Sequence, residues 1–191
     1  MIPKLLANDL ICAIDFESTG TQRGWKPVEF ACALMTLDGQ IVRYFESEIT
    51  VERQASSAAK RFTQDNAAQS LRDCWSEIED FVQDQHICGH NVGVDKQLLL
   101  KEFPLITNKS YIDTFNIYRQ LYGGQIPDYS LEALLHTFEL HDKLEDLKVN
   151  DHWQAHRALY DAVGSALLLT RLYQDPQTRP LFDSPVQDEL F

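Results

Sequence analysis

Short apolar runs separated by turn residues divide the first part of the chain into strands. The run Leu10–Ile14 has the length and boundaries of a buried strand. A second run, Phe30–Thr36, is followed by Asp38-Gly39 and then by a third run, Gln40–Ser47. An Asp-Gly pair between two apolar runs is typical of a tight hairpin turn. The pattern therefore predicts three strands, of which the last two form a hairpin.

Helical spacing dominates the later part of the chain. Apolar residues predict a helix from about Leu71 to Gln83, with Ser70 and Asp73 as a capping box. Residues 48–69 show no clear period, and we expect only loop and short helix there. The remaining elements expected from the pattern are a strand at His86–His90, a helix that has Asn91 as its N-cap and extends through Leu100, a strand at Ser110–Asp113, helices at Thr114–Leu121 and after Ser130, and a long helix that includes Leu159–Thr170.

This order of elements predicts one α/β domain. Three strands come first, and helices that alternate with two more strands follow, which is typical of a mixed five-stranded sheet with helices on both faces. Pro176, Pro180 and Pro185 exclude a continuing helix near the C-terminal end. We therefore expect a folded domain at residues 1–174 and a flexible tail at residues 175–191.

Composition is typical of a cytoplasmic globular protein. The hydrophobic fraction is 44% and the charged fraction is 24%, both ordinary values. We expect no membrane partner, because no apolar stretch is long enough to cross a bilayer and the first residues lack the pattern of a signal peptide. No spacing typical of a zinc site links the cysteines, so we expect buried thiols in a reducing cytoplasm at Cys12, Cys32, Cys74 and Cys88.

The net charge of −12 limits the ways in which this protein could bind nucleic acid. It argues against a passive binder that surrounds nucleic acid with Lys and Arg. It does not argue against an enzyme that meets a nucleic-acid end through metal ions, because bound cations then supply the local positive charge.

Two acids, Asp15 and Glu17, follow the first apolar run. Side chains on a strand alternate between faces, so both carboxylates point the same way and Phe16 points the other. Two like charges at a strand end repel each other, and a divalent cation would convert that repulsion into affinity. Considered alone, the pair is better explained as two solvated acids at the mouth of a loop.

Three further residues extend the acidic pattern. Asp95 lies one helical turn beyond Asn91, and His156 and Asp161 precede the long apolar helix. His156 and Asp161 are five positions apart and would not share a helix face, so they converge only if His156 lies at the entry to the helix. Considered singly, Asp95 could be a solvated helix acid, His156 a packing or capping residue, and Asp161 the partner of Arg157.

Taken together in this order, D-x-E, N-x-x-x-D and H-x-x-x-x-D resemble the motifs of the DEDDh, or DnaQ-like, 3′–5′ exonucleases. This family includes the proofreading epsilon subunits of bacterial DNA polymerase III, RNase T and oligoribonuclease. The resemblance extends from about Ile11 to Leu172 and implies an RNase H-like fold. Ser18 and Val94 depart from the usual Thr and Phe, residues 48–69 do not match, and Asp113 is expected to be a helix cap or structural acid.

The resemblance implies a role for each acidic residue. Two Mg²⁺ or Mn²⁺ ions would be held, with Asp15 bridging both. Glu17 and Asp161 would hold the ion on the nucleophile side, and Asp95 would hold the other, partly through water. His156 would be the general base that deprotonates the attacking water. The product would be a nucleoside 5′-monophosphate.

The same resemblance implies contacts with substrate and partners. Ser18, Thr19, Gly20 and Asn91 would contact the terminal nucleotide at a 3′ end. At the C-terminus, Gln187, Leu190 and Phe191 form Q-x-x-L-F, which resembles the peptide by which bacterial polymerases and repair proteins dock on the sliding clamp. A frayed terminus is the alternative.

Substrate class is open at the level of sequence. The tail alone favours DNA, and with it replication or repair, because the acids do not distinguish DNA from RNA. An RNA-trimming 3′–5′ exonuclease is one alternative, and a non-catalytic nucleic-acid- or clamp-binding module is another. The expected protein partner is a sliding clamp or a polymerase subunit. The complete set of acids argues against a module without catalytic activity.

Overall fold

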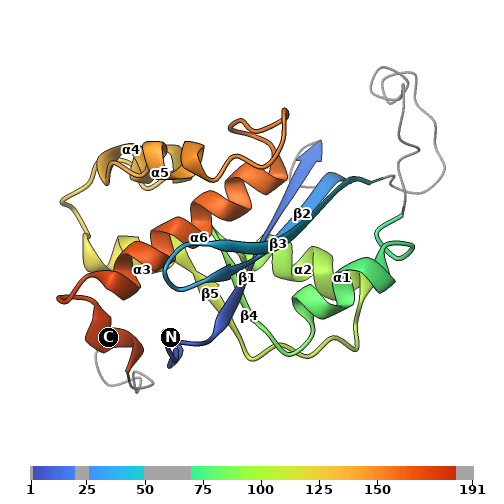
Figure 1. The fold of residues 1–191 in the computed structure, drawn as a ribbon, viewed down its shortest axis with the longest axis horizontal. Helices are drawn as coiled ribbons and strands as arrows, with labels where there is room; N and C mark the ends of the chain where they lie inside the picture. Colours follow the sequence, from blue (N-terminus) through green and yellow to red (C-terminus); the bar gives the residue numbers. More distant parts are fainter. Residues whose placement is uncertain (1, 20–25, 50–69, 184–191) are drawn as a thin grey trace.

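A mixed five-stranded sheet with helices on both faces forms the fold, as the sequence predicts (Figure 1). The computed structural model describes residues 2–19, 26–49 and 70–183. The strand order is β3-β2-β1-β4-β5, in which β2 is antiparallel to β1 and β3, whereas β4 and β5 run parallel to β1. The strands are β1 (Leu10–Thr19), β2 (Lys26–Thr36), β3 (Ile41–Glu48), β4 (His86–Gly89) and β5 (Ser110–Asp113).

The helices are divided between the two faces of the sheet. α1 and α2 cover one face, while α6 crosses the other with α4 and α5 outside it (Figure 1). α6 runs antiparallel to β1, so its first turn lies beside the end of that strand (Figure 1). The helices are α1 (Trp75–Val82), α2 (Gly93–Glu102), α3 (Thr114–Leu121), α4 (Leu131–Thr137), α5 (His141–Asp146) and α6 (Ala158–Gln174), followed by a short 3₁₀ helix at Arg179–Phe182.

Side chains that alternate between the two faces of β1 contribute to two separate hydrophobic cores. Ile14 and Phe16 pack with α1 and α2, while Ala13 packs with α6. The small side chains of Ala31 and Ala33 on β2 also face α6 and leave room for the helix to lie close to the sheet. The same alternation continues into the acid pair, so Asp15 and Glu17 point toward the α6 face.

Two helix starts differ from the sequence expectation. Ser70 and Asp73 hydrogen-bond to each other, with Ser70 Oγ 2.8 Å from Asp73 Oδ2, but they close a separate turn, and α1 begins only at Trp75. Asn91 has a φ of +65° and therefore lies outside α2, whose N-cap is Val92. α1 therefore begins four residues later than expected, and the N-cap of α2 lies one residue later than expected. The short helix α5 was not expected from the pattern.

The packed domain extends beyond residue 174. Phe182 is fully buried against Tyr173, and its carbonyl oxygen accepts a hydrogen bond from the Leu5 N–H at 3.0 Å. The expected start of the tail at residue 175 is therefore too early, because an aromatic anchor holds residues 175–183 on the domain. The expectations for Gly20, for residues 50–69 and for Gln187, Leu190 and Phe191 lie outside the described residues.

The expectations for the cysteines and for the starts of two helices are confirmed. All four cysteines are buried and none is in a disulfide. α3 begins and ends where the sequence predicts, and the Ser130 hydroxyl accepts from the N–H of Ala133 at the start of α4. In the described ranges, no helix has the length and apolar character needed to span a bilayer.

Candidate metal centre

Three elements bring the predicted acids together at one end of the sheet. β1 carries Asp15 and Glu17, the first turn of α2 carries Asp95, and the first turn of α6 carries Asp161. The Asp15 carboxylate lies close enough to the other three for their charges to act on it. Glu17, Asp161 and His156 each offer one ligand atom, and these three atoms lie within 4.8 Å of one another.

Asp95 is held by the strand that carries the other acids. It is only 6% exposed, and its Oδ1 accepts a hydrogen bond from the Phe16 N–H at 3.1 Å. The alternative of a solvated helix acid is therefore wrong. Because Phe16 lies between Asp15 and Glu17, this bond connects α2 directly to the acid pair.

Crowding and burial make the charged forms of these acids costly. Burial raises the pKa of Asp15 well above its usual range, and the charges of Asp95, Asp161 and Glu17 raise it further. Burial, as the main cause, raises the pKa of Asp95 to about 7. It also raises the pKa of Asp161 to about 7, with the Glu17 charge adding to the effect and His156 opposing it.

The donor set fits a hard divalent cation. Carboxylate oxygens are the ligands that Mg²⁺ and Mn²⁺ prefer, and a cation among these acids would relieve the repulsion that raises their pKa values. The residues that could hold such ions are Asp15, Glu17, Asp95 and Asp161, with His156 beside them.

His156 meets Asp161 because it lies outside the helix. Its φ is +64°, and Arg157 then serves as the N-cap of α6 in an extended conformation. The Asp161 carboxylate accepts a hydrogen bond from the His156 backbone N–H, which draws the two residues together. This is the arrangement that the five-residue spacing requires. The His156 side chain is exposed and therefore open to water and substrate.

The segment Gly89-His90-Asn91 forms a scaffold for the second motif. His90 Nδ1 lies 2.9 Å from Thr114 Oγ1, and its Nε2 lies 2.8 Å from the Tyr129 carbonyl oxygen. The Asn91 N–H donates to Asp113 Oδ1 at 3.0 Å. Asp113 also caps α3, so its expected structural role is confirmed.

Gly89 allows β4 to approach β1 immediately before the acid pair. A Cβ at this position would lie 2.9 Å from Val92 Cγ2 and 3.2 Å from the Ile14 carbonyl oxygen. The first distance is shorter than side chains tolerate, so the glycine is needed for close approach and not for an unusual φ.

Three of the expected substrate-contacting residues, Ser18, Thr19 and Asn91, are exposed beside elements that carry the acids. Ser18 and Thr19 are exposed at the end of β1, directly after Glu17. Asn91 is exposed before α2, two residues ahead of its first helical position. Their side chains are therefore open to solvent.

The structure adds two residues that the sequence did not identify, Glu29 and Arg157. Glu29 on β2 pairs directly with Glu17 on β1, is 7% exposed, and lies 3.1 Å from Arg157 Nε through its Oε1. The alternative that Arg157 pairs with Asp161 is therefore wrong. The sequence does not predict a role for Glu29, because the residues that it contacts on β1 are decided by the register between the two strands.

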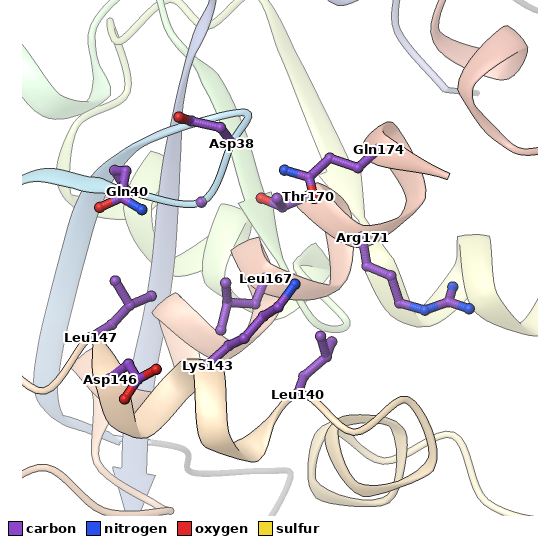
Figure 2. Close-up of a pocket in the computed structure, with 11 residues that line it drawn as sticks. Asp38, Gln40, Leu140, Lys143, Asp146, Leu147, Leu167, Thr170, Arg171 and Gln174 are labelled. Atoms are coloured by element: carbon purple, nitrogen blue, oxygen red, sulfur yellow. The ribbon is translucent and has the colours of Figure 1, made fainter. Parts of the chain in front are cut away.

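A cavity of about 230 Å³ lies at the other end of the sheet (Figure 2). It is bounded by the β2–β3 turn at Asp38 and by α5 and α6. Two of its polar groups have structural uses. Gln174 Nε2 donates to the Leu37 carbonyl oxygen at 3.3 Å, and the Arg171 guanidinium, which extends away from Asp38 in Figure 2, lies 3.8 Å from the centre of the Phe138 ring. The acid cluster is therefore the better candidate for a functional site.

Comparison with known proteins places this chain in a family. Residues 12–169 match a family described as Exonuclease. DNA polymerase III PolC-type proteins of Bacillus subtilis (strain 168) and Bacillus cereus are 25% and 24% identical, over 90% of this chain. The chain spans only 12% of the length of each of these relatives.

Solved structures support the same fold. E. coli exonuclease I in complex with a dT13 oligonucleotide has a TM-score of 0.63 and 16% identity, over 92% of this chain and 43% of that chain. Exonuclease I from Methylocaldum szegediense has a TM-score of 0.57 and 17% identity, over 88% of this chain and 41% of that chain. The expected RNase H-like fold is thereby confirmed. The chain belongs to the family described as Exonuclease, in agreement with the resemblance carried by its acidic motifs.

Proposed function

We propose that this chain is a metal-dependent 3′–5′ exonuclease that removes nucleotides from DNA ends. The observation that supports this most directly is the convergence of Glu17, His156 and Asp161. Their ligand atoms lie within 4.8 Å of one another although Glu17 is far in the sequence from the other two. The raised pKa values of Asp15 and Asp95 add support, because buried acids that repel one another are suited to binding a cation.

Asp15, Glu17, Asp95 and Asp161 would hold two divalent ions, Mg²⁺ or Mn²⁺. Bound there, the ions would neutralise phosphate oxygens and favour ionisation of the attacking water. Because its first oxygen is engaged by the Phe16 N–H, Asp95 would offer its other oxygen.

His156 would act as the general base. Its exposed imidazole would accept a proton from the water that attacks the terminal phosphodiester phosphorus. The bond between phosphorus and the 3′ oxygen of the preceding nucleotide would then break, so the phosphate would leave with the terminal nucleotide as a nucleoside 5′-monophosphate. Asp161, adjacent to His156, would stabilise the imidazole after it gains the proton.

Single-stranded or frayed DNA ends are the substrate that we favour. The similar proteins include a PolC-type DNA polymerase and an exonuclease I in complex with oligonucleotides, which supports DNA over RNA. Ser18, Thr19, Gly20 and Asn91 would contact the terminal nucleotide. RNA trimming is the second candidate, since the acids suit either polymer.

Release of mononucleotides from labelled substrates tests this proposal. Single-stranded DNA, duplex DNA and RNA carrying a 3′ label are incubated with Mg²⁺, Mn²⁺ or EDTA. We expect rapid release of nucleoside 5′-monophosphates from single-stranded DNA with either ion and none in EDTA. Faster release from RNA would favour the second candidate, and cleavage in EDTA or at internal sites would contradict the metal-dependent exonuclease.

We also propose that the C-terminal Q-x-x-L-F segment tethers the enzyme to a bacterial sliding clamp or a polymerase subunit, in the cytoplasm. The support is the sequence of Gln187, Leu190 and Phe191. A tether would raise the local concentration at DNA without a basic surface, which suits a chain with a net charge of −12. Deleting residues 187–191 should abolish co-elution with purified clamp and leave nucleotide release from free oligonucleotides unchanged. Absence of clamp binding by the intact chain would end this proposal.

A further inference from the structure

An ion pair connects the sheet to the loop that carries the proposed general base. Arg157 Nε donates to Glu29 Oε1 at 3.1 Å, and the two side chains are only 28% and 10% exposed. Glu29 lies on β2, directly opposite Glu17 on β1. Arg157 lies between His156 and the first helical residue of α6. The pair therefore spans from the strands of the acid cluster to the start of the helix that supplies Asp161.

Glu29 occupies a costly position for a carboxylate. Burial raises its pKa, Arg157 lowers it, and the nearby charges of Glu46 and Glu17 raise it further. A buried ion pair gives little net stability compared with apolar residues of similar volume, because both charges lose their hydration. The presence of this buried pair is therefore better explained by a role in orienting the loop than by a contribution to stability.

The conformation of the loop requires such an anchor. The φ of His156, +64°, lies in a sparsely populated region that persists only when the surroundings hold it. Beyond it, the Arg157 carbonyl oxygen accepts the Asp161 N–H at 3.0 Å. Fixing Arg157 on the sheet thus fixes both where the His156 side chain leaves the backbone and where α6 begins.

A second contact holds the same loop from β3. Asn150 Nδ2 donates to Glu46 Oε1 at 2.7 Å, and Glu46 pairs with Ala31 on the same face of the sheet. The Asn150 contact lies six residues before His156, whereas the Arg157 contact lies directly beside it. The Arg157 contact is therefore the one that controls the position of the imidazole.

We propose that Glu29 and Arg157 are positioning residues for the hydrolysis. Together they hold His156 and Asp161 against Glu17, and they would act on the reaction through these residues. This inference rests on the proposed exonuclease function. Because small errors in the position of a catalytic group reduce the rate strongly, loss of the pair should lower kcat while substrate and metal binding change little.

Glutamine substitutions test the pair in the full-length protein. E29Q and R157Q should each lower kcat for single-stranded DNA by about tenfold or more, while KM and the Kd for Mn²⁺ stay within about threefold. The double variant should be no slower than the worse single variant, because the two residues act as one unit. R157K should recover part of the rate, since lysine keeps the charge but not the planar guanidinium.

A matched control comes from another Arg–Glu pair in the same chain. Arg72 Nε lies 2.9 Å from Glu102 Oε2, an ion pair of the same atom types that lies before α1 and at the end of α2. R72Q and E102Q should keep the kcat of the unmodified protein. Thermal unfolding of every variant shows which of them are folded, and E29Q and R157K carry the test if R157Q does not fold.

The outcomes separate this inference from the proposed function. An unchanged kcat in folded E29Q and R157Q, or additive losses in the double variant, would overturn the positioning role while the exonuclease stands. Absence of activity in the unmodified protein would overturn the exonuclease. In that case amide hydrogen exchange at residues 156–161 with Mn²⁺ present still decides the positioning role: faster exchange in E29Q than in E102Q supports it, and equal exchange overturns it.

Discussion

At the scale of single residues, the acids of the cluster lower the stability of the metal-free protein but suit it to bind cations. Asp15, Asp95 and Asp161 all have raised pKa values because burial and mutual repulsion penalise their charged forms. A site selected only for folding would replace one of them. Their joint presence is understandable if cations occupy the site in the working protein.

Asp95→Asn should therefore stabilise the metal-free protein and abolish activity. The amide oxygen can still accept the Phe16 N–H, while the buried charge is removed. In EDTA at pH 8 we expect a higher Tm than in the unmodified protein, by about 2–4 °C for each kcal/mol relieved. Added Mn²⁺ should then raise the Tm of this variant much less. Asp142→Asn, an exposed substitution with the same charge change, is the control. A lower Tm for Asp95→Asn in EDTA would contradict the electrostatic explanation.

His156→Ala should affect catalysis and spare metal binding. Removing a general base typically reduces the rate by about 10²–10⁴-fold. We expect kcat to fall in that range at saturating Mg²⁺, while the Kd for Mn²⁺ from calorimetry remains close to that of the unmodified protein. His152→Ala changes an exposed histidine of the same loop and should leave kcat unchanged. Equal rates for His156→Ala and His152→Ala would remove His156 from the mechanism.

At the scale of elements, the site depends on how closely β1, β4, α2 and α6 approach one another. Ala13 on β1 and Ala31 on β2 leave room for α6 to lie against the sheet, and Gly89 allows the end of β4 to approach Ile14 on β1. These residues carry no chemistry, but each determines the distance between elements that supply an acid.

Gly89→Ala should lower stability and disturb the site. The added Cβ would lie 2.9 Å from Val92 Cγ2, so the turn before α2 must move, and Asp95 moves with it. We expect the free energy of unfolding to fall by about 1–3 kcal/mol, measured by urea denaturation, together with weaker Mn²⁺ binding. Gly93→Ala is the matched control, because a Cβ there meets nothing within 4 Å. Similar stability losses in the two variants would show that close approach at Gly89 is not the cause.

At the scale of the whole molecule, pH and divalent ions should control stability together. The pKa of Asp95 is 3.8 in an ordinary carboxyl and about 7 in the folded protein, and the same holds for Asp161. Between these values the folded state binds more protons than the unfolded state, so the contribution of these acids to the unfolding free energy falls as pH rises. Above about pH 7 that contribution reaches its lowest value, and metal ions that replace the protons should bind best.

Thermal unfolding across pH checks this behaviour. In EDTA, the Tm of Asp95→Asn minus the Tm of the unmodified protein should grow from pH 5 to pH 8, which isolates Asp95 from the histidines that titrate in the same range. The increase in Tm caused by Mn²⁺ in the unmodified protein should also be larger at pH 8 than at pH 6. A difference in Tm that shrinks as pH rises would mean that the pKa of Asp95 is not raised in the folded state.

The sequence by itself determined the features that depend only on residues a few positions apart in the chain. Alternation along β1 predicted that Asp15 and Glu17 share a face, and the spacing of His156 and Asp161 required that the histidine precede the helix. The boundaries of α3 also follow from local signals, since Asp113 caps the helix through a bond to Asn116, three residues away. Such features are readable because strand and helix periodicity and side-chain caps act over a few residues.

Only the tertiary structure decided which distant residues meet. The burial of Asp95 comes from a hydrogen bond between residues 79 positions apart, and the Glu29–Arg157 pair joins residues 128 positions apart. The register of β2 on β1, with its irregularity after Glu17, decides that Glu29 faces the site. Residues 175–183 were assigned to a tail because prolines exclude a long helix, yet Phe182 is buried on the domain. These outcomes depend on how the elements pack, and packing is a property of the assembled core that no local pattern contains.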